Sequence, residues 1–71
     1  MENMEYILTT RIGELQELLA RIDASFETVK SSRNFDEYMR NSLSAALTSA
    51  RSHRMTELNE AMEQLRQIRK A

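Results

Sequence analysis

His53 is the only imidazole in this chain of 71 residues, and two carboxylates, Glu57 and Glu60, follow it at helical spacing. On a helix these three side chains share one face, and imidazole with carboxylate is a ligand set for a divalent transition metal. Three ligands from one exposed helix bind a metal weakly, and a second helix would have to complete the coordination shell. We therefore expect an ordinary exposed histidine, no metal site and no cofactor.

The pair Ser52–His53 resembles, at these two residues alone, the dimerisation helices of histidine kinases. That family has an acid directly after its histidine and a proline a few residues later. Here Arg54 and Met55 follow the histidine, and the chain contains no proline. The carboxylates of the chain are scattered over predicted solvent faces, and none is set against a buried base or nucleophile, as acid–base catalysis requires. We expect no catalytic residue and predict that the chain is not an enzyme.

Two arginines, Arg11 and Arg54, fall within otherwise apolar helical stripes. Like charges at one level of a helical pair are costly unless carboxylates join them, and Glu14 and Glu57 are each one turn away. One interpretation is a polar layer that fixes the register of the helices or holds an anion. The other is that both arginines lie at the edge of the stripe, with packed stems and hydrated heads. The sequence leaves both interpretations open.

Charge is unevenly divided along the chain. Residues 1–30 carry six acids and three bases, whereas residues 31–71 carry five acids and seven bases. Arg40, Arg51 and Arg69 fall on one side of the second predicted helix, and a basic face of this kind can follow nucleic-acid phosphates. Against this alternative, the net charge is −1 and no aromatic residue lies among these arginines. We expect no nucleic-acid binding and keep a nucleic-acid-binding regulator as the alternative function.

The composition favours helices, because the chain has one glycine, no proline and many Leu, Glu, Ala, Arg, Met and Gln residues. It has no cysteine, which excludes disulfides and thiolate metal sites and fits a reducing compartment. No apolar run approaches the roughly 20 residues that span a bilayer, and the acidic start Met-Glu-Asn-Met-Glu is unlike a signal peptide. We expect a single cytoplasmic domain over residues 1–71 with no membrane contact.

Helical spacing is clearest in an apolar stripe near the N-terminus. Its members recur three or four residues apart over about five turns. They are Met4, Leu8, Ile12, Leu15, Leu18, Leu19, Ile22, Phe26 and Val29. Because Leu18 and Leu19 both belong to the stripe, it covers an arc of roughly 120°. An arc of this width suits packing between two neighbouring helices, as in a four-helix bundle. We predict a helix over about residues 3–30.

Residues 31–34, Ser-Ser-Arg-Asn, are the only segment with loop character. We predict the turn there, with Asn34 as the N-cap and Glu37 three residues later completing a capping box. The second helix then covers about residues 35–69. Its apolar positions continue through a polar central segment with one extra four-residue step, which is a stutter in a heptad pattern. We favour one continuous helix, whereas a break near Ser52 would give three helices.

A connection of four residues returns the second helix antiparallel to the first. Residues whose numbers sum to about 65 then lie at one level, so Leu47 is expected opposite Leu18. The second helix extends past the start of the first, which leaves Leu65 and Ile68 without a partner in the chain. The segment 42–50 is rich in small side chains. It is either a groove for another helix or a region of tight packing against the first helix.

These patterns predict an all-α fold, an antiparallel two-helix hairpin like a coiled coil, which pairs into a four-helix bundle. A chain this short gains only roughly 3–5 kcal/mol from its own core, which favours association. We expect a homodimer or a complex with a helix of a partner protein. The predicted interface residues are Leu8, Ile12, Leu15, Leu19, Ile22, Phe26, Leu43, Leu47, Leu58, Leu65 and Ile68.

The function that this architecture favours is a protein–protein interaction module: an adaptor, a small chaperone-like subunit or an inhibitor in a bacterial or phage system. Small helical co-chaperones of secretion systems are similar in architecture. That similarity concerns the fold alone, because no motif in the chain carries it.

Overall fold

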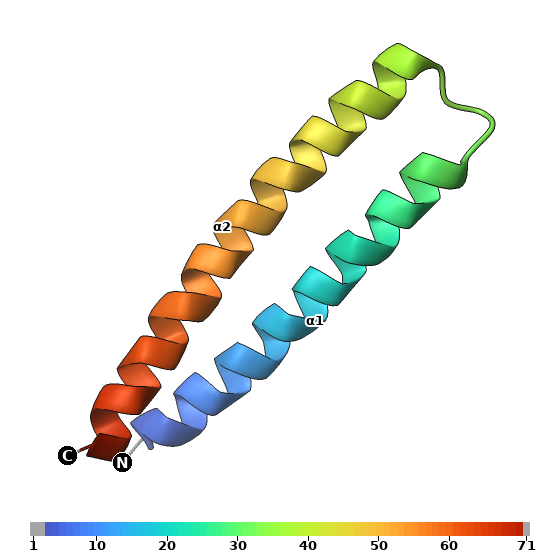
Figure 1. Cartoon of the computed structure of the whole chain (residues 1–71). Coiled ribbons are helices and arrows are strands. Elements are labelled where there is room, and N and C mark those ends of the chain that lie inside the picture. The colour runs from blue at the N-terminus through green and yellow to red at the C-terminus, as the bar shows by residue number, and fades with distance from the viewer. Residues whose placement is uncertain (1–2, 71) are drawn as a thin grey trace.

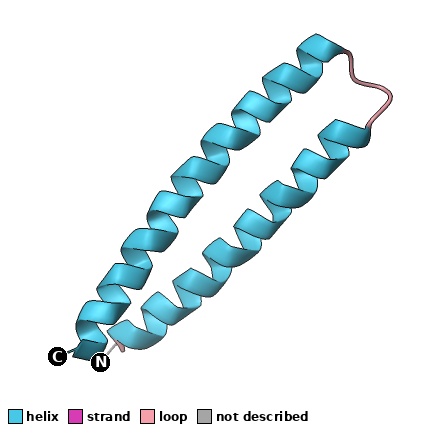
Figure 2. Ribbon diagram, viewed as in Figure 1, coloured by secondary structure: helices cyan, strands magenta, loops and turns pink. Residues whose placement is uncertain are grey.

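The computed structural model describes residues 3–70 and shows two long helices lying side by side. Helix α1 (Met4–Ser31) and helix α2 (Glu37–Lys70) run antiparallel, and residues 32–36 connect them (Figures 1 and 2). The hairpin measures 52 × 16 × 14 Å between Cα atoms. The predicted all-α hairpin is confirmed, and α2 continues through Ser52 without a break.

Side-chain and backbone caps fix both ends of α1. The Asn3 side chain accepts hydrogen bonds from the backbone N–H groups of Glu5 (3.0 Å) and Tyr6 (3.3 Å), which have no partner inside the helix. At the other end, the Ser32 backbone N–H donates to the Thr28 carbonyl oxygen at 3.0 Å, and Ser32 itself is extended. The helix therefore ends where the backbone changes conformation, within two residues of the prediction.

The cap of α2 differs from the sequence-based prediction, which placed it at Asn34. Asp36 is the N-cap: its carboxylate accepts from the Met39 backbone N–H at 2.8 Å, and its carbonyl accepts from the Arg40 N–H at 3.0 Å. Asn34 lies in the connection, where its N–H donates to the Ser32 hydroxyl at 3.3 Å. Aspartate caps as well as asparagine does, and its charge also favours the positive end of the helix dipole.

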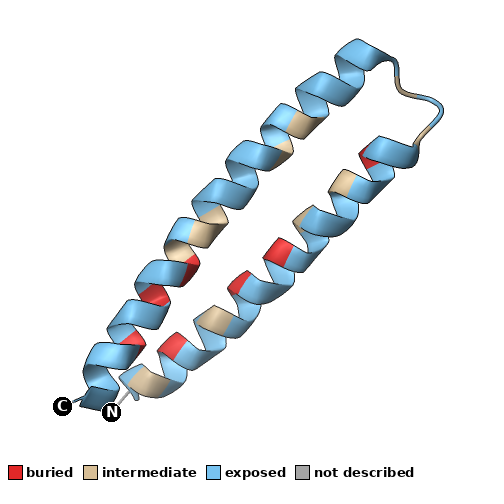
Figure 3. Cartoon of the chain, in the orientation of Figure 1, coloured by how far each residue is buried: buried red, intermediate tan, exposed pale blue. Residues whose placement is uncertain are grey.

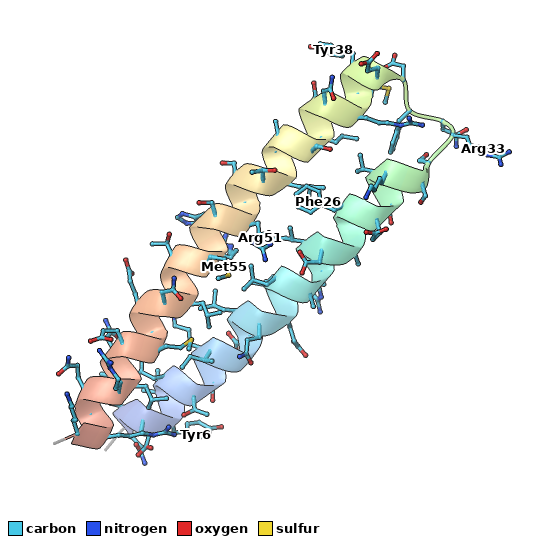
Figure 4. All side chains as sticks on the ribbon, in the orientation of Figure 1. Tyr6, Phe26, Arg33, Tyr38, Arg51 and Met55 are labelled. Atoms are coloured by element: carbon cyan, nitrogen blue, oxygen red, sulfur yellow. The ribbon has the colours of Figure 1, made fainter. Side chains whose placement is uncertain are left out.

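The buried core comprises two neighbouring clusters in the half of the hairpin away from the connection, and Val29 is buried separately, near the connection (Figure 3). The first cluster contains Leu8, Ala61 and Leu65, and the second contains Leu15, Leu19 and Leu58. Ile12 packs against both clusters, and Met55 packs against the second. Figure 4 shows Met55 and Phe26 between the helices, whereas Tyr6 and Tyr38 point away.

The register of the two helices also differs from the prediction. Contacts that cross the hairpin join residues whose numbers sum to between 68 and 74, as Arg11–Glu57 and Glu5–Arg69 do, and not to about 65. The later start of α2 lengthens the connection, which moves every residue of α2 along α1. As a consequence, Leu65 packs against Leu8, and the predicted overhang at the end of α2 is wrong.

Packing is thin in the half of the hairpin near the connection. Within the described chain, no residue of α2 before Leu58 is buried, and only Ser44 and Leu47 of the segment 42–50 are half-buried. Small side chains remove little apolar area from water, so they add little to stability. The expected tight packing against α1 is not found, because the segment is mostly exposed, and a groove for another helix stays a prediction.

The cap at Asp36 yields the first prediction. Asp36→Ala should lower the free energy of unfolding by about 1 kcal/mol, because it leaves the Met39 N–H without its acceptor. Asn34→Ala is the matched control, since its side chain makes no such bond, and its effect should stay within about 0.5 kcal/mol. Urea denaturation followed by circular dichroism measures both values. An equal loss for the two variants would contradict the assignment of the cap.

Candidate interaction surface

A carboxylate joins the two arginines that the sequence placed within the apolar stripes. Glu57 Oε2 accepts from Arg11 Nη2 across the hairpin at 2.8 Å, and Glu57 Oε1 accepts from Arg54 Nη1 one turn earlier on α2. His53 Nε2 lies 3.4 Å from the same Oε1 atom. The Glu57 side chain is 20% exposed, while those of Arg11 and Arg54 are 53% and 39% exposed. This polar layer links the helices at the edge of the core. The two arginines share a carboxylate, as in the first interpretation, and their side chains remain partly exposed, as in the second.

The opposite edge of the hairpin carries two further ion pairs between the helices. Glu5 binds Arg69 at 2.9 Å, and Asp23 binds Arg51 at 3.3 Å. The two acids are 18 residues apart, as are the two arginines, and 18 residues make about five full turns. Both pairs therefore lie on one edge. Arg11 follows Glu5 by six residues, about two-thirds of a turn further round the helix, which places the polar layer on the other edge.

Exposed apolar side chains gather on the edge that carries the polar layer. On α1, Met4 and Leu18 stand seven residues before and after Arg11, and Ile7 stands four before it. On α2, the corresponding side chains stand 18 and 14 residues before Glu57 and 11 after it, which is close to a whole number of turns in each case. We call these six residues, each more than one-third exposed, the apolar face: Met4, Ile7, Leu18, Met39, Leu43 and Ile68.

The structure divides the predicted interface residues into three groups. Those buried inside the hairpin are Leu8, Leu15, Leu19, Leu58 and Leu65. Those half-buried are Ile12, Ile22, Phe26 and Leu47. Only Leu43 and Ile68 are exposed and belong to the apolar face. Most of the predicted interface is therefore the hairpin's own core, and its role in association stays a prediction.

Met4, Ile7, Leu18 and Met39 belong to the apolar face but were not among the predicted interface residues. Leu18, Arg11 and Met4 are spaced seven residues apart, and this spacing in the sequence indicates a second line of residues along α1, beside the line of core residues.

The arginine side of α2 is engaged within the hairpin. Arg51 and Arg69 bind carboxylates of α1, and Arg40 Nη2 donates to the Ser32 carbonyl oxygen at 2.6 Å. Near the end of α2, hydrogen bonds from Arg66 and then Gln67 lower the pKa of the exposed Glu63 carboxyl. Carboxylates thus balance the charge of Arg51, Arg66 and Arg69, whereas Arg40 is held by a neutral carbonyl group.

Neither metal binding nor membrane crossing has a site in the described part of the chain. His, Asp and Glu side chains of residues 3–70 form no cluster of three that would hold a metal ion, although His53 and Glu57 lie close together. Of α1 and α2, neither combines the length and the apolar character that crossing a membrane requires. Comparison of the chain with models of protein families, with curated proteins and with solved structures finds no significant match.

The polar layer yields the second prediction. Glu57→Gln should lower the free energy of unfolding by about 1 kcal/mol, because two partly exposed arginines lose their shared counter-charge and water screens the loss only in part. Glu60→Gln, on the exposed side of the same helix, is the control and should change stability by less than about 0.5 kcal/mol. The difference should shrink in high salt. Equal effects in urea denaturation would show that the layer contributes no stability.

Proposed function

We propose that this hairpin is a protein–protein interaction module without catalytic activity, and that its apolar face is the surface that binds. The observation that carries the proposal is the position of six exposed, large apolar side chains on one edge of a hairpin whose core is already closed. Exposed apolar surface marks protein interaction sites, and here one polar layer interrupts it. The partner is a pair of helices, so that the complex is a four-helix bundle.

The size of the core supports association. Seven apolar residues are buried, and six of them form two clusters of three. A chain this small gains only roughly 3–5 kcal/mol from such a core, so covering the apolar face would add a large fraction of the total stability. A homodimer or a complex with helices of another protein both meet this need. Adaptor, chaperone-like subunit and inhibitor are the roles that fit, and the bacterial or phage origin and the cytoplasmic location stay predictions.

Association yields the third prediction. The wild-type chain should sediment as a dimer at micromolar concentration, and its melting temperature should rise with concentration, since binding couples to folding. Leu18→Asp should dissociate the complex and keep the hairpin helical, because Leu18 is 38% exposed in the single chain. Leu19→Asp should unfold the hairpin, because Leu19 is buried in a core cluster.

Ala24→Asp is the matched control, since Ala24 lies on the exposed back of α1 and should leave the dimer intact. A concentration-independent melt, together with a monomer by sedimentation, would contradict homomeric pairing. Loss of helicity in Leu18→Asp would contradict the distinction between face and core.

The alternative function, nucleic-acid binding through the arginine side of α2, yields the fourth prediction. Arg40, Arg51 and Arg69 already have partners within the hairpin, and the chain has no excess of positive charge. We expect no salt-sensitive binding to RNA or DNA at physiological ionic strength in fluorescence-anisotropy titrations. Sub-micromolar binding that is lost when the three arginines are replaced with glutamine would promote the alternative instead.

A further inference from the structure

We infer that the apolar face pairs with the same face of a second copy in antiparallel orientation, with Leu18 at the two-fold axis. This inference rests on the proposed function and adds the identity, direction and register of the partner. Three features of the hairpin support it: the area of the side that carries the apolar face, the charges on the rim of that face and the size of the side chains along it.

The area of the face is that of a dimer interface. The Cα outline of one side of the hairpin, 52 Å long and 16 Å wide, encloses about 800 Å² of polar and apolar residues together, which is similar to the area that each subunit usually contributes to a specific interface. A second copy presents a surface of the same length and the same apolar character. Two hairpins paired in this way have no overhang at either end, and all four helices are covered on their apolar sides.

A two-fold axis allows two arrangements of the facing hairpins. If the axis runs along the helices, the copies are parallel, and α1 of one copy lies over α2 of the other at the same level. If the axis crosses the helices, the copies are antiparallel, and each helix lies over its own counterpart in the opposite direction. The two arrangements bring different side chains together, so the sequence along the face distinguishes them.

Charge on the rim favours the antiparallel arrangement. Glu14 and Arg21 lie four residues before and three residues after Leu18, on the outer flank of the apolar face. Neither forms an ion pair with another residue of the segment 3–70. When Leu18 lies on the axis, Glu14 of each copy lies opposite Arg21 of the other, which makes two symmetric pairs of opposite charge. Complementary charges of this kind fix orientation and register at an interface.

The parallel arrangement opposes like charges instead. Contacts across the hairpin place Glu14 and Glu57 at nearly the same level, as the bond between Arg11 and Glu57 shows. With α1 over α2 of the second copy, Glu14 would therefore lie against Glu57 of that copy. Leu18 would lie near Arg54 in the same way. Both juxtapositions are unfavourable. The antiparallel dimer brings Arg54 close to Arg54 of the second copy, but Glu57 already pairs with each of these arginines, whereas Glu14 has no ion-pair partner among residues 3–70, so the balance of charge favours the antiparallel dimer.

Side-chain size along α2 points the same way. In the antiparallel dimer, Met39 at the start of α2 meets Ile68 at the end of the other α2, whereas in the parallel dimer Ile68 would meet Met4, so the apolar ends are covered in both arrangements and the small residues of α2 distinguish them. The bulky Glu57 lies opposite Ala50, which is small and exposed. Large against small is how facing layers of a helical bundle interlock. The segment 42–50, which packs little inside the hairpin, thus receives the polar layer of the second copy.

Disulfide trapping tests the orientation of the two copies. Because the chain contains no cysteine, the introduced cysteines are the only ones that can form a disulfide. A mixture of Met39→Cys chains and Ile68→Cys chains should form a covalent heterodimer in a redox buffer. These positions lie about 44 Å apart along one α2 helix, so no disulfide joins them within a single chain or within a parallel dimer. Leu18→Cys alone should form a symmetric disulfide. A mixture of Met4→Cys and Ile68→Cys chains reports the parallel dimer and should stay reduced.

Charge reversal tests the register. Glu14→Arg and Arg21→Glu should each weaken dimerisation by about tenfold in sedimentation equilibrium, because each puts like charges opposite each other twice. The double variant Glu14→Arg with Arg21→Glu should restore the wild-type affinity. Recovery separates a contact between copies from an effect of either substitution on α1 alone.

The outcomes are distinct. Cross-linking of Met4→Cys with Ile68→Cys, without the other two disulfides, overturns the orientation and leaves the interaction module standing. If the chain is a dimer but forms none of these disulfides, and if the double variant does not recover the wild-type affinity, then the apolar face is not the surface through which the copies pair. A chain that stays monomeric at high concentration overturns the second copy as the partner.

Discussion

A helix whose apolar arc is wider than one neighbouring helix can cover leaves part of that arc in water, and this constraint shapes the hairpin. The inner part of the arc on α1 packs against α2, where Leu8, Leu15 and Leu19 are buried. The flank remains exposed at Met4, Ile7 and Leu18 because α2 lies to one side of it. The core and the apolar face are thus two parts of one continuous apolar surface on α1.

The two edges of the hairpin differ in how charged and apolar side chains are arranged along them. On one edge, Glu5 and Asp23 bind Arg69 and Arg51, and Met62, seven residues before Arg69, is an exposed large apolar side chain beside these ion pairs. On the other, one polar layer around Glu57 interrupts a row of apolar side chains. An interface with a single polar layer gains specificity from it, because a shifted partner would leave buried charges unpaired. The two edges therefore differ, and six of the exposed large apolar side chains lie on the edge that carries the polar layer.

The sequence predicted the features that depend on spacing within one helix. Core residues such as Leu15 and Leu58 and the uninterrupted α2 all follow from the three-and-four residue pattern. It failed where two equivalent signals compete. Asn34 and Asp36 are both good N-caps, and choosing the first shifted the register of the whole hairpin.

The face itself could not be separated from the core by spacing alone. Leu18 and Leu19 are adjacent members of one stripe, yet one is 38% exposed and the other is buried. Which of the two leucines is buried depends on the side from which α2 packs against α1, and that direction is set by the packing of the two helices together. Arg11 and Arg54 show the same limit, because the sequence offered both Glu14 and Glu57 as the carboxylate that joins them, and the packed pair of helices selects Glu57.

The location of the core far from the connection has a kinetic consequence. Most helical hairpins can close from the turn outward, each contact bringing the next within reach. Here the cross-hairpin ion pairs join positions 28 residues apart for Asp23 and Arg51, 46 apart for Arg11 and Glu57 and 64 apart for Glu5 and Arg69, and both core clusters lie beyond the first of these pairs. The chain must close this long loop, and lose the corresponding conformational entropy, before those contacts form and stabilise the hairpin. We expect folding slower than that of a hairpin with its core beside the turn, measurable by stopped-flow refolding.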